Sequence, residues 1–391
     1  MNTNNSEFIN KTIDNWEDLS LSNNLLRGIY AYGFENPSPI QKQGIYPILN
    51  KKDIIAQAQS GTGKTGCFAV ASLSLIDLSN LSSQILILAP TRELAIQINN
   101  VIKSIGTFMK NLKTQLLIGG ISVDQCINEL RENPHIVVGC PGRVYDMFRR
   151  KELKADQLKC IILDEADEML SSGFKEQIYN IFQFMPTDIQ VGLFSATLQP
   201  ELLMITDKFM RDPVKILIKS EALTLEGINQ YYIALEDDAG KYECIKDLFE
   251  TFSISQCIIY CNSIKRVEDL YAEMIKDNFP VGQLHSNMDK QERTDNFNEF
   301  KSGKVRVLIS SNVTARGIDI QQVSTIVNFD IPNCVATYLH RIGRSGRWGR
   351  KGIGINFVTK RDIKSMKEIE QHYATEIKEM PINWGETLEK I

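Results

Sequence analysis

Residues 58–65 have the types and spacing of a phosphate-binding loop: Ala58, Gln59, Ser60, Gly61, Thr62, Gly63, Lys64 and Thr65. Small residues at a strand-to-helix turn let backbone N–H groups converge on a phosphate, and the helix N-terminus adds partial positive charge. Lys64 can then reach the β- and γ-phosphates of a nucleotide, and the Thr65 hydroxyl can bind Mg²⁺. Ala58 stands where the usual pattern has Gly, and an ordinary glycine-rich turn is the alternative. The Gly-Lys-Thr ending favours a nucleotide-phosphate site.

A second chemical group follows the apolar run 160–163, where the chain reads Asp164-Glu165-Ala166-Asp167. In a chain that carries a phosphate loop, an acidic pair after a buried strand is the expected other half of a nucleotidase site. Asp164 would hold Mg²⁺ through water, and Glu165 would orient and deprotonate the attacking water. A solvated acidic loop is the alternative.

Polar and glycine residues also follow other apolar runs. They are Pro90, Thr91, Arg92, Gly119, Gly120, Cys140, Gly142, Arg143, Ser195 and Thr197. Arginine, hydroxyls and exposed glycine backbone suit a phosphodiester chain that is bound without reading its sequence. Each group alone is more often a structural turn.

Arginines recur at every third position near the C-terminus, at Arg341, Arg344 and Arg347. Such spacing can place fixed positive charge on a phosphoryl-transfer transition state. A surface basic patch is the alternative, and His340 beside them can be a core or hinge histidine.

Short apolar runs alternate with helical stretches and should position these groups. The runs predicted as strands are 53–58, 85–89, 113–118, 136–139, 160–163, 191–194 and 214–218, and then 230–234, 257–260, 281–284, 305–309, 325–328 and 354–358. Apolar strands separated by helices predict an α/β fold with mainly parallel sheets covered on both faces. Helices are expected over 22–32, from 40, from 66 and over about 360–377. We expect a loose tail over 1–15, domains over 16–218 and 228–391, and a linker over 219–227.

Composition limits the kinds of ligand and the compartment that the protein can have. The chain has 391 residues, 43% hydrophobic and 24% charged, with a net charge of −4. A broad basic surface is thereby excluded, so nucleic acid would need a local groove. Eight Cys without a CxxC pair and four His indicate no zinc site and a reducing compartment. No signal peptide or membrane-spanning run is present, so we expect a soluble intracellular protein.

In order and spacing, these motifs resemble those of the DEAD-box RNA helicases. The resemblance includes Gln41 upstream and continues through 315–319 and 340–347, covering about Trp16 to Trp384. The stretches 25–34, 164–173, 208–213 and 223–227 look most like the translation initiation factor 4A group of that family.

The resemblance implies two tandem RecA-like domains that close on ATP, Mg²⁺ and RNA and separate strands locally rather than by tracking. Gln41 would read the adenine edge and Phe34 would stack on the base, with Trp16 as the isolated upstream aromatic. Asp319 would meet the ribose, while Arg344 and Arg347 would reach the γ-phosphate. ATP hydrolysis and RNA binding would be coupled by Asp167, Ser195, Thr197, His340 and Arg341. Ser311 would contact RNA. The resemblance also implies binding to RNA backbone and 2′-hydroxyls. We expect a monomer with a translation initiation scaffold protein as a partner, and a cytoplasmic location with the nucleus as the alternative.

The chain departs from the family pattern mainly outside the ATP site. Cys140 replaces the Thr of Thr-Pro-Gly-Arg, Ser310-Ser311-Asn312 stands for Thr-Thr-Asp, Thr294 ends the usual Gln-Glu-Arg-Asp, and Ser286-Asn287 replaces Gly-Asp. We therefore expect ATP hydrolysis to be retained while RNA grip or coupling differs, with Cys140→Thr and Asn312→Asp raising RNA affinity or RNA-stimulated turnover. An ATP-gated RNA clamp with little unwinding remains an alternative, as does a two-domain ATPase acting on DNA or proteins.

Overall fold

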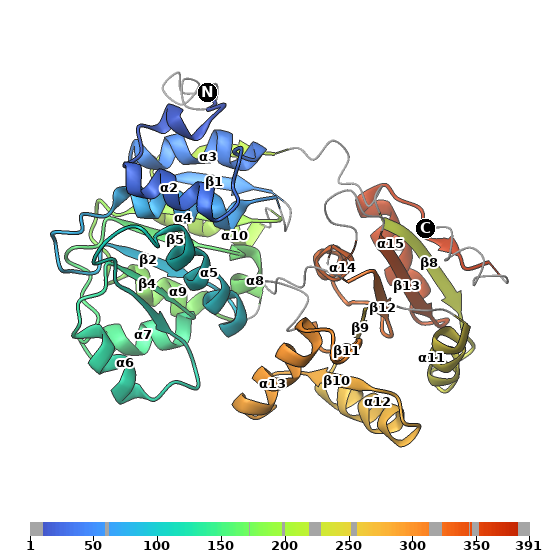
Figure 1. The fold of residues 1–391 in the computed structure, drawn as a ribbon. Helices are drawn as coiled ribbons and strands as arrows, with labels where there is room; N and C mark the ends of the chain where they lie inside the picture. Colours follow the sequence, from blue (N-terminus) through green and yellow to red (C-terminus); the bar gives the residue numbers. More distant parts are fainter. Residues whose placement is uncertain are drawn as a thin grey trace. The chain divides into compact units, whose positions relative to one another are not determined.

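The computed structural model describes residues 11–58, 62–171, 173–197, 200–218, 228–251, 256–312, 323–343, 345 and 352–381. The chain divides into two compact units, Met1–Lys219 and Ser220–Ile391, called here the first and second unit (Figure 1). The linker predicted over 219–227 lies outside the described residues. Each unit is built around its own sheet.

The first unit contains a seven-stranded sheet in the order β3-β4-β2-β5-β6-β1-β7, and every pair of neighbours is parallel. Its strands are β1 (Ile54–Gln57), β2 (Ile85–Leu88), β3 (Thr114–Leu117), β4 (Ile136–Gly139), β5 (Cys160–Leu163), β6 (Gln190–Ser195) and β7 (Val214–Leu217). Its helices are η1 (Trp16–Leu19), α2 (Asn23–Ala31), α3 (Pro39–Leu49), α4 (Lys64–Leu75), α5 (Arg92–Ile105), α6 (Val123–Leu130), α7 (Pro141–Arg149), α8 (Ala166–Ser171), α9 (Lys175–Phe182) and α10 (Pro200–Phe209).

The first unit has a core on each face of its sheet because alternate residues of a strand point to opposite faces. In β2, Ile85 and Ile87 join the cluster that contains α4 and α5, while Leu86 and Leu88 join the cluster that contains α7 and α9. All four residues are buried. A strand covered on both faces must be apolar throughout, which is the pattern that predicted it.

The second unit repeats this plan with a seven-stranded sheet, β10-β11-β9-β12-β13-β8-β14, again with parallel neighbours. Its elements are β8 (Ile228–Ala234), α11 (Gly240–Thr251), β9 (Cys257–Tyr260), α12 (Ile264–Lys276), β10 (Val281–Leu284), α13 (Lys290–Lys301), β11 (Val307–Ser310), β12 (Thr325–Asn328), α14 (Val335–Ile342), β13 (Gly352–Val358), α15 (Ile363–Tyr373) and β14 (Lys378–Glu379). In both units all the strands predicted from the sequence are present.

Three segments differ from the sequence prediction. Helix α4 begins at Lys64 rather than Gly66, and α15 ends at Tyr373 because Ala374 adopts a left-handed conformation with φ 47°. The chain then adds the short β14 beside β8, which the sequence did not indicate. Residues 1–10 of the expected tail lie outside the described residues. Residues 11–15 are held, since Ile13 is buried and its N–H bonds to the Lys42 carbonyl.

Candidate nucleotide and RNA site

Apart from Trp16, Phe34 and Gln41, which precede β1, the groups predicted to do chemistry in the first unit follow or end a strand at its carboxyl end. The phosphate loop follows β1, and the groups at Pro90, Gly119, Cys140, Asp164 and Ser195 follow or end β2, β3, β4, β5 and β6. The carboxyl ends of parallel strands meet at one edge of a sheet, which is where ligands bind in such folds. Sequence positions from 58 to 197 are therefore gathered at one edge, called here the carboxyl edge.

The phosphate loop joins β1 to α4. Gly63 caps α4 with φ 99°, a conformation that only glycine adopts without strain. Lys64 is buried, and its Nζ donates to the carbonyl of Ala58 at 2.5 Å across the loop. The N–H of Ala58 in turn donates to the carbonyl of Ser195. Gln59, Ser60 and Gly61 lie outside the described residues. The described residues of the loop are Ala58 and Thr62 to Thr65.

Gln41 lies against this turn. Its Oε1 accepts from the Ser38 N–H at 2.8 Å, and its Nε2 donates to the Gly63 carbonyl at 3.2 Å. A carboxamide has two donor hydrogens and two acceptor sites, so one of each stays available for a base. A Cβ at Gly66 would lie 2.5 Å from Gln41 Nε2 and 2.7 Å from Phe34 Cε2, so the glycine permits both side chains to reach the helix N-terminus.

Trp16 stands behind Phe34 rather than on the surface. It is fully buried, its ring stacks on Phe34 with centroids 6.3 Å apart, and its Nε1 donates to the Phe34 carbonyl at 2.9 Å. Trp16 was predicted to take part in nucleotide binding, and the geometry allows it to do so only through Phe34.

The acidic group after β5 is buried. Asp164 is 3% exposed and Glu165 is 5% exposed. Burial, and then the neighbouring Glu165 carboxylate, raise the pKa of Asp164, while Lys64 lowers it. Glu165 adopts φ 50°, which is costly for a residue other than glycine and is found at functional sites. A buried carboxylate whose charge is disfavoured by its surroundings is well suited to receive a cation.

Asp167 links this acidic group to β6. The Thr197 hydroxyl donates to Asp167 Oδ2 at 2.8 Å, and the Ser195 hydroxyl donates to the Thr197 carbonyl at 2.6 Å. Gln57, opposite Ser195 in the sheet, donates through Nε2 to the Ala196 carbonyl at 3.3 Å. Gln57 is not among the residues predicted from the sequence, although a polar residue at the end of an apolar strand was a signal for it.

The groups predicted to bind RNA in the first unit have two kinds of environment. Gly119, Gly120 and Gly142 are exposed, and a Cβ at Gly119 or Gly142 would meet no atom within 4 Å. Pro90 is buried, and Thr91 caps α5 by accepting from the Leu94 N–H, with Arg92 next in the helix. Exposed glycine backbone leaves room for a close-lying chain.

Arg143 is partly committed to the protein itself. Its Nη1 donates to the Ile121 carbonyl at 2.8 Å and contacts Cys126 Sγ at 3.0 Å, so it holds the loop after Gly120 against α7. Cys140 occupies the N-cap of α7 and gives no side-chain cap there.

In the second unit, Ser311, His340 and Arg341 are described and all three are buried. Ser311 follows β11, and His340 and Arg341 lie in the last turn of α14. Asp319, Arg344 and Arg347 lie outside the described residues.

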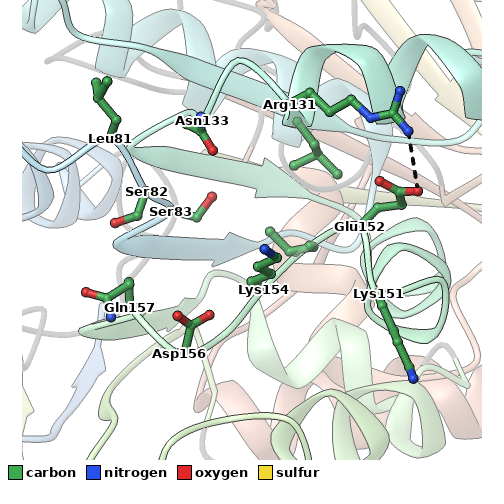
Figure 2. Close-up of a pocket in the computed structure, with 12 residues that line it drawn as sticks. Leu81, Ser82, Ser83, Arg131, Asn133, Lys151, Glu152, Lys154, Asp156 and Gln157 are labelled. Carbon is green, nitrogen blue, oxygen red and sulfur yellow. Dashed lines mark ion pairs between the residues drawn. The ribbon is translucent and has the colours of Figure 1, made fainter.

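A surface pocket of about 440 Å³ lies elsewhere in the first unit (Figure 2). It is formed by the loops that precede β2, β4 and β5, including Leu81, Asn133 and Lys154, with an Arg131–Glu152 ion pair of 3.9 Å at its rim. Since the pocket adjoins the amino ends of these strands, it is separate from the carboxyl edge. None of the residues that line it is a predicted site residue.

Two further observations concern the described residues. None of their helices is long and apolar enough to cross a membrane. Among these same residues, no three His, Cys, Asp or Glu side chains form a group that could hold a metal ion by themselves.

Known proteins of one family are similar to this chain in sequence and in fold. The DEAD/DEAH box helicase family matches residues 38–205, and the helicase conserved C-terminal domain matches residues 240–349. A structure of S. cerevisiae Dbp5 bound to RNA and ADP BeF3 is similar with a TM-score of 0.89 and 34% identity, covering 97% of this chain and 98% of that chain. A structure of Mss116p bound to ssRNA and AMP-PNP has a TM-score of 0.85 and 26% identity, covering 95% of this chain and 80% of that chain.

Curated relatives are more similar still. The ATP-dependent RNA helicase eIF4A of Chaetomium globosum is 52% identical over 373 residues, which is 95% of this chain and 94% of that protein. That of Kluyveromyces lactis is 50% identical over 376 residues, 96% and 95% of the two chains. The chain belongs to the DEAD/DEAH box helicase family, among its eIF4A-type ATP-dependent RNA helicases. The predicted tandem RecA-like fold is confirmed.

Proposed function

We propose that this enzyme hydrolyses ATP to ADP and phosphate, and that hydrolysis is coupled to RNA binding and to local, non-processive separation of short duplexes during translation initiation. The observation that carries the proposal is the carboxyl edge of the first unit. There the phosphate loop, the buried Asp164-Glu165 pair and the Asp167–Thr197 hydrogen bond of 2.8 Å lie at the ends of neighbouring strands. A nucleotide site and a backbone-binding surface on one edge can respond to each other.

The chain's own residues would bind the nucleotide as follows. Gln41 uses its remaining donor and acceptor on the adenine edge, which selects ATP, and Phe34 stacks on the base. In the loop that begins at Ala58, backbone N–H groups from Gln59 to Thr65 and the N-terminus of α4 hold the phosphates. Lys64 leaves the Ala58 carbonyl to meet the β- and γ-phosphates, and Asp319 of the second unit meets the ribose.

Residues fit for Mg²⁺ are present at the same edge. The Thr65 hydroxyl and the Asp164 carboxylate, partly through water, would hold the ion, with the remaining ligands coming from phosphate oxygens and water. The bound ion would neutralise phosphate charge.

Glu165 orients and deprotonates the attacking water in this proposal. Arg344 and Arg347 supply positive charge at the γ-phosphate when the units close, with Arg347 as the finger. Since these arginines belong to the second unit, turnover would depend on closure.

RNA would be bound through its backbone and 2′-hydroxyls, without regard to sequence. The exposed backbone of Gly119, Gly120 and Gly142, the side chain of Arg92 and the region of Ser311 form the proposed surface, with Pro90, Thr91, Cys140 and Arg143 shaping it. Asp167, Ser195, Thr197, His340 and Arg341 would link this surface to the nucleotide. We also propose that the protein is a cytoplasmic monomer that works with a translation initiation scaffold protein.

The test is ATP turnover with and without single-stranded RNA, with single-stranded DNA as the control. Stimulation by RNA alone, together with ATP-dependent separation of a short RNA duplex, is the expected result. Hydrolysis indifferent to RNA, with RNA still bound, would contradict the proposal and favour an ATP-gated clamp. Equal stimulation by DNA would contradict the choice of RNA.

A further inference from the structure

Arg341 in α14 is fully buried, and the structure accounts for each of its guanidinium N–H groups. Nε and Nη2 both donate to Asn312 Oδ1, at 2.9 and 2.6 Å. Nη1 donates to Asn328 Oδ1 at 3.1 Å and to the Asp330 carbonyl at 2.7 Å. Nη2 also donates to Asn262 Oδ1 at 2.7 Å. Arginine has five such donors in a fixed plane, and all five are used.

These acceptors belong to three different strand ends. Asn262 comes after β9, Asn312 after β11, and Asn328 and Asp330 at and after β12. Arg341 therefore ties α14 to the carboxyl ends of three adjacent strands of the second unit, β11, β9 and β12. Asn312 directly follows Ser311, which is in the proposed RNA surface, and α14 ends one residue after Arg341.

Within the described part of the chain, these acceptors are amide or backbone carbonyl oxygens. The Asp330 carboxylate is nearby but engaged elsewhere, since its Oδ1 pairs with Lys241 at 3.2 Å and Arg266 at 2.8 Å. Its Oδ2 accepts from the Asn262 N–H at 3.0 Å. Burial lowers the pKa of Arg341 to about 10, which still leaves it charged at neutral pH. Asn312 thus keeps the two hydrogen bonds that a carboxylate at this position would accept, without supplying a counter-charge.

We propose that Arg341 is a positioning residue that fixes the Ser311-bearing strand end against α14, and that the side-chain oxygen of Asn312 is what it holds. RNA binding then depends on an acceptor oxygen at position 312, whether or not that oxygen carries charge. The proposal rests on the RNA-dependent activity proposed above. Asn312 departs from the Asp of the family pattern, but its amide oxygen still accepts the hydrogen bonds from Arg341. The departure therefore need not weaken RNA binding.

The test compares two substitutions at one position in the full-length chain. Asn312→Leu keeps the size of the side chain but removes the acceptor, whereas Asn312→Asp keeps the acceptor and adds a charge. We expect Asn312→Leu to raise the RNA concentration that gives half-maximal ATP turnover by about tenfold, the effect of losing hydrogen bonds to a charged group. Asn312→Asp should stay at or below the wild-type value. Arg341→Lys, with three donors in place of five, should behave like Asn312→Leu.

The control is Arg306→Lys, which changes an exposed arginine of the same unit in the same way. Nucleotide affinity without RNA should be the same in Arg306→Lys and the wild type, because Arg306 is an exposed residue outside the proposed nucleotide site. Turnover is measured well below each variant's unfolding midpoint, so that a merely structural role would lower the midpoint and leave the RNA dependence unchanged. Equal RNA dependence of Asn312→Leu, Asn312→Asp and wild type would overturn the inference. A wild-type enzyme that RNA does not stimulate would instead refute the proposed function.

Discussion

Glu165, the proposed general base, combines burial with an unusual backbone conformation. It is almost fully buried, adopts a left-handed backbone conformation and follows directly on the carboxylate proposed to receive Mg²⁺. Such a conformation is retained where the surroundings impose it. The side chain proposed to take the proton is therefore held by the backbone as well as by packing.

We predict that Glu165→Gln reduces ATP turnover by about a hundredfold or more, the usual contribution of a general base, while ATP binding is retained. The amide keeps the size of the side chain but cannot accept the proton. Single-turnover hydrolysis and binding of a fluorescent ATP analogue measure the two effects separately. Glu176→Gln, an exposed glutamate in α9, is the matched control. Undiminished hydrolysis in Glu165→Gln would place the base elsewhere.

Trp16 is the second residue for which we make a prediction, because one hydrogen bond joins its side chain to the backbone of Phe34. We predict that Trp16→Phe raises the KM for ATP by about three- to tenfold with little change in kcat, because the loss of one buried hydrogen bond costs about 1 kcal/mol. The lost bond is the one from Nε1 to the Phe34 carbonyl, at 2.9 Å, which orients the residue proposed to stack on adenine. Steady-state kinetics at saturating RNA provide the measurement.

Tyr30→Phe is the control for Trp16→Phe, since it removes an exposed hydrogen bond from Tyr30 to Glu17 in the same region. If both variants have the wild-type KM, Trp16 has no part in nucleotide binding.

At the scale of elements, β1 must lie between β6 and β7 for the phosphate loop to reach its neighbours. Asp53, at the start of β1, connects the three strands. Its Oδ1 accepts from the Val191 N–H at 2.8 Å, and its Oδ2 accepts from the Arg211 N–H at 2.6 Å. Both bonds are formed by a carboxylate that is only 3% exposed.

We predict that Asp53→Ala lowers the free energy of unfolding of the first unit by about 3 kcal/mol, because buried N–H donors lose a charged acceptor. Urea unfolding followed by circular dichroism measures this loss. Asp53→Asn, which keeps an acceptor oxygen, should be less destabilised. A loss for Asp53→Ala no greater than for Asp53→Asn would mean that the carboxylate does not hold these strands together.

At the scale of the whole molecule, the chain consists of two compact units with separate cores. The phosphate loop lies entirely in the first. A ligand stabilises the part of a protein that binds it, by about 2.7 kcal/mol at one hundred times its dissociation constant.

We therefore predict two unfolding transitions in urea, of which Mg²⁺ and an ATP analogue without RNA raise only one. Intrinsic fluorescence and protease resistance of fragments from each unit should identify the raised transition as that of the first unit. A single transition that moves as a whole with nucleotide would show that the units unfold together.

Much of this protein could be predicted from its sequence because its signals are local. A strand covered on both faces must be apolar throughout, so runs such as 85–88 are recognisable without any partner. The phosphate loop and the Asp164-Glu165 pair are continuous stretches whose chemistry depends on residue type and spacing. The sequence by itself therefore determined the α/β class, the two-part organisation and the order of the motifs along the chain.

Which residues meet in space could not be predicted in this way, because hydrogen bonds across a sheet join positions that no local pattern relates. Gln57 and Ala196 are 139 residues apart, yet Gln57 ends β1 and Ala196 directly follows β6, the neighbouring strand. Burial is equally non-local. Arg341 is part of an arginine series that suggested positive charge at a phosphoryl group, with a surface basic patch as the alternative. Three strand ends enclose its guanidinium in the second unit. Arg341 is a buried residue that hydrogen-bonds to three strand ends, and Trp16 is a buried residue that packs on Phe34. Neither environment could be predicted locally, because the surroundings of each side chain come from distant parts of the chain.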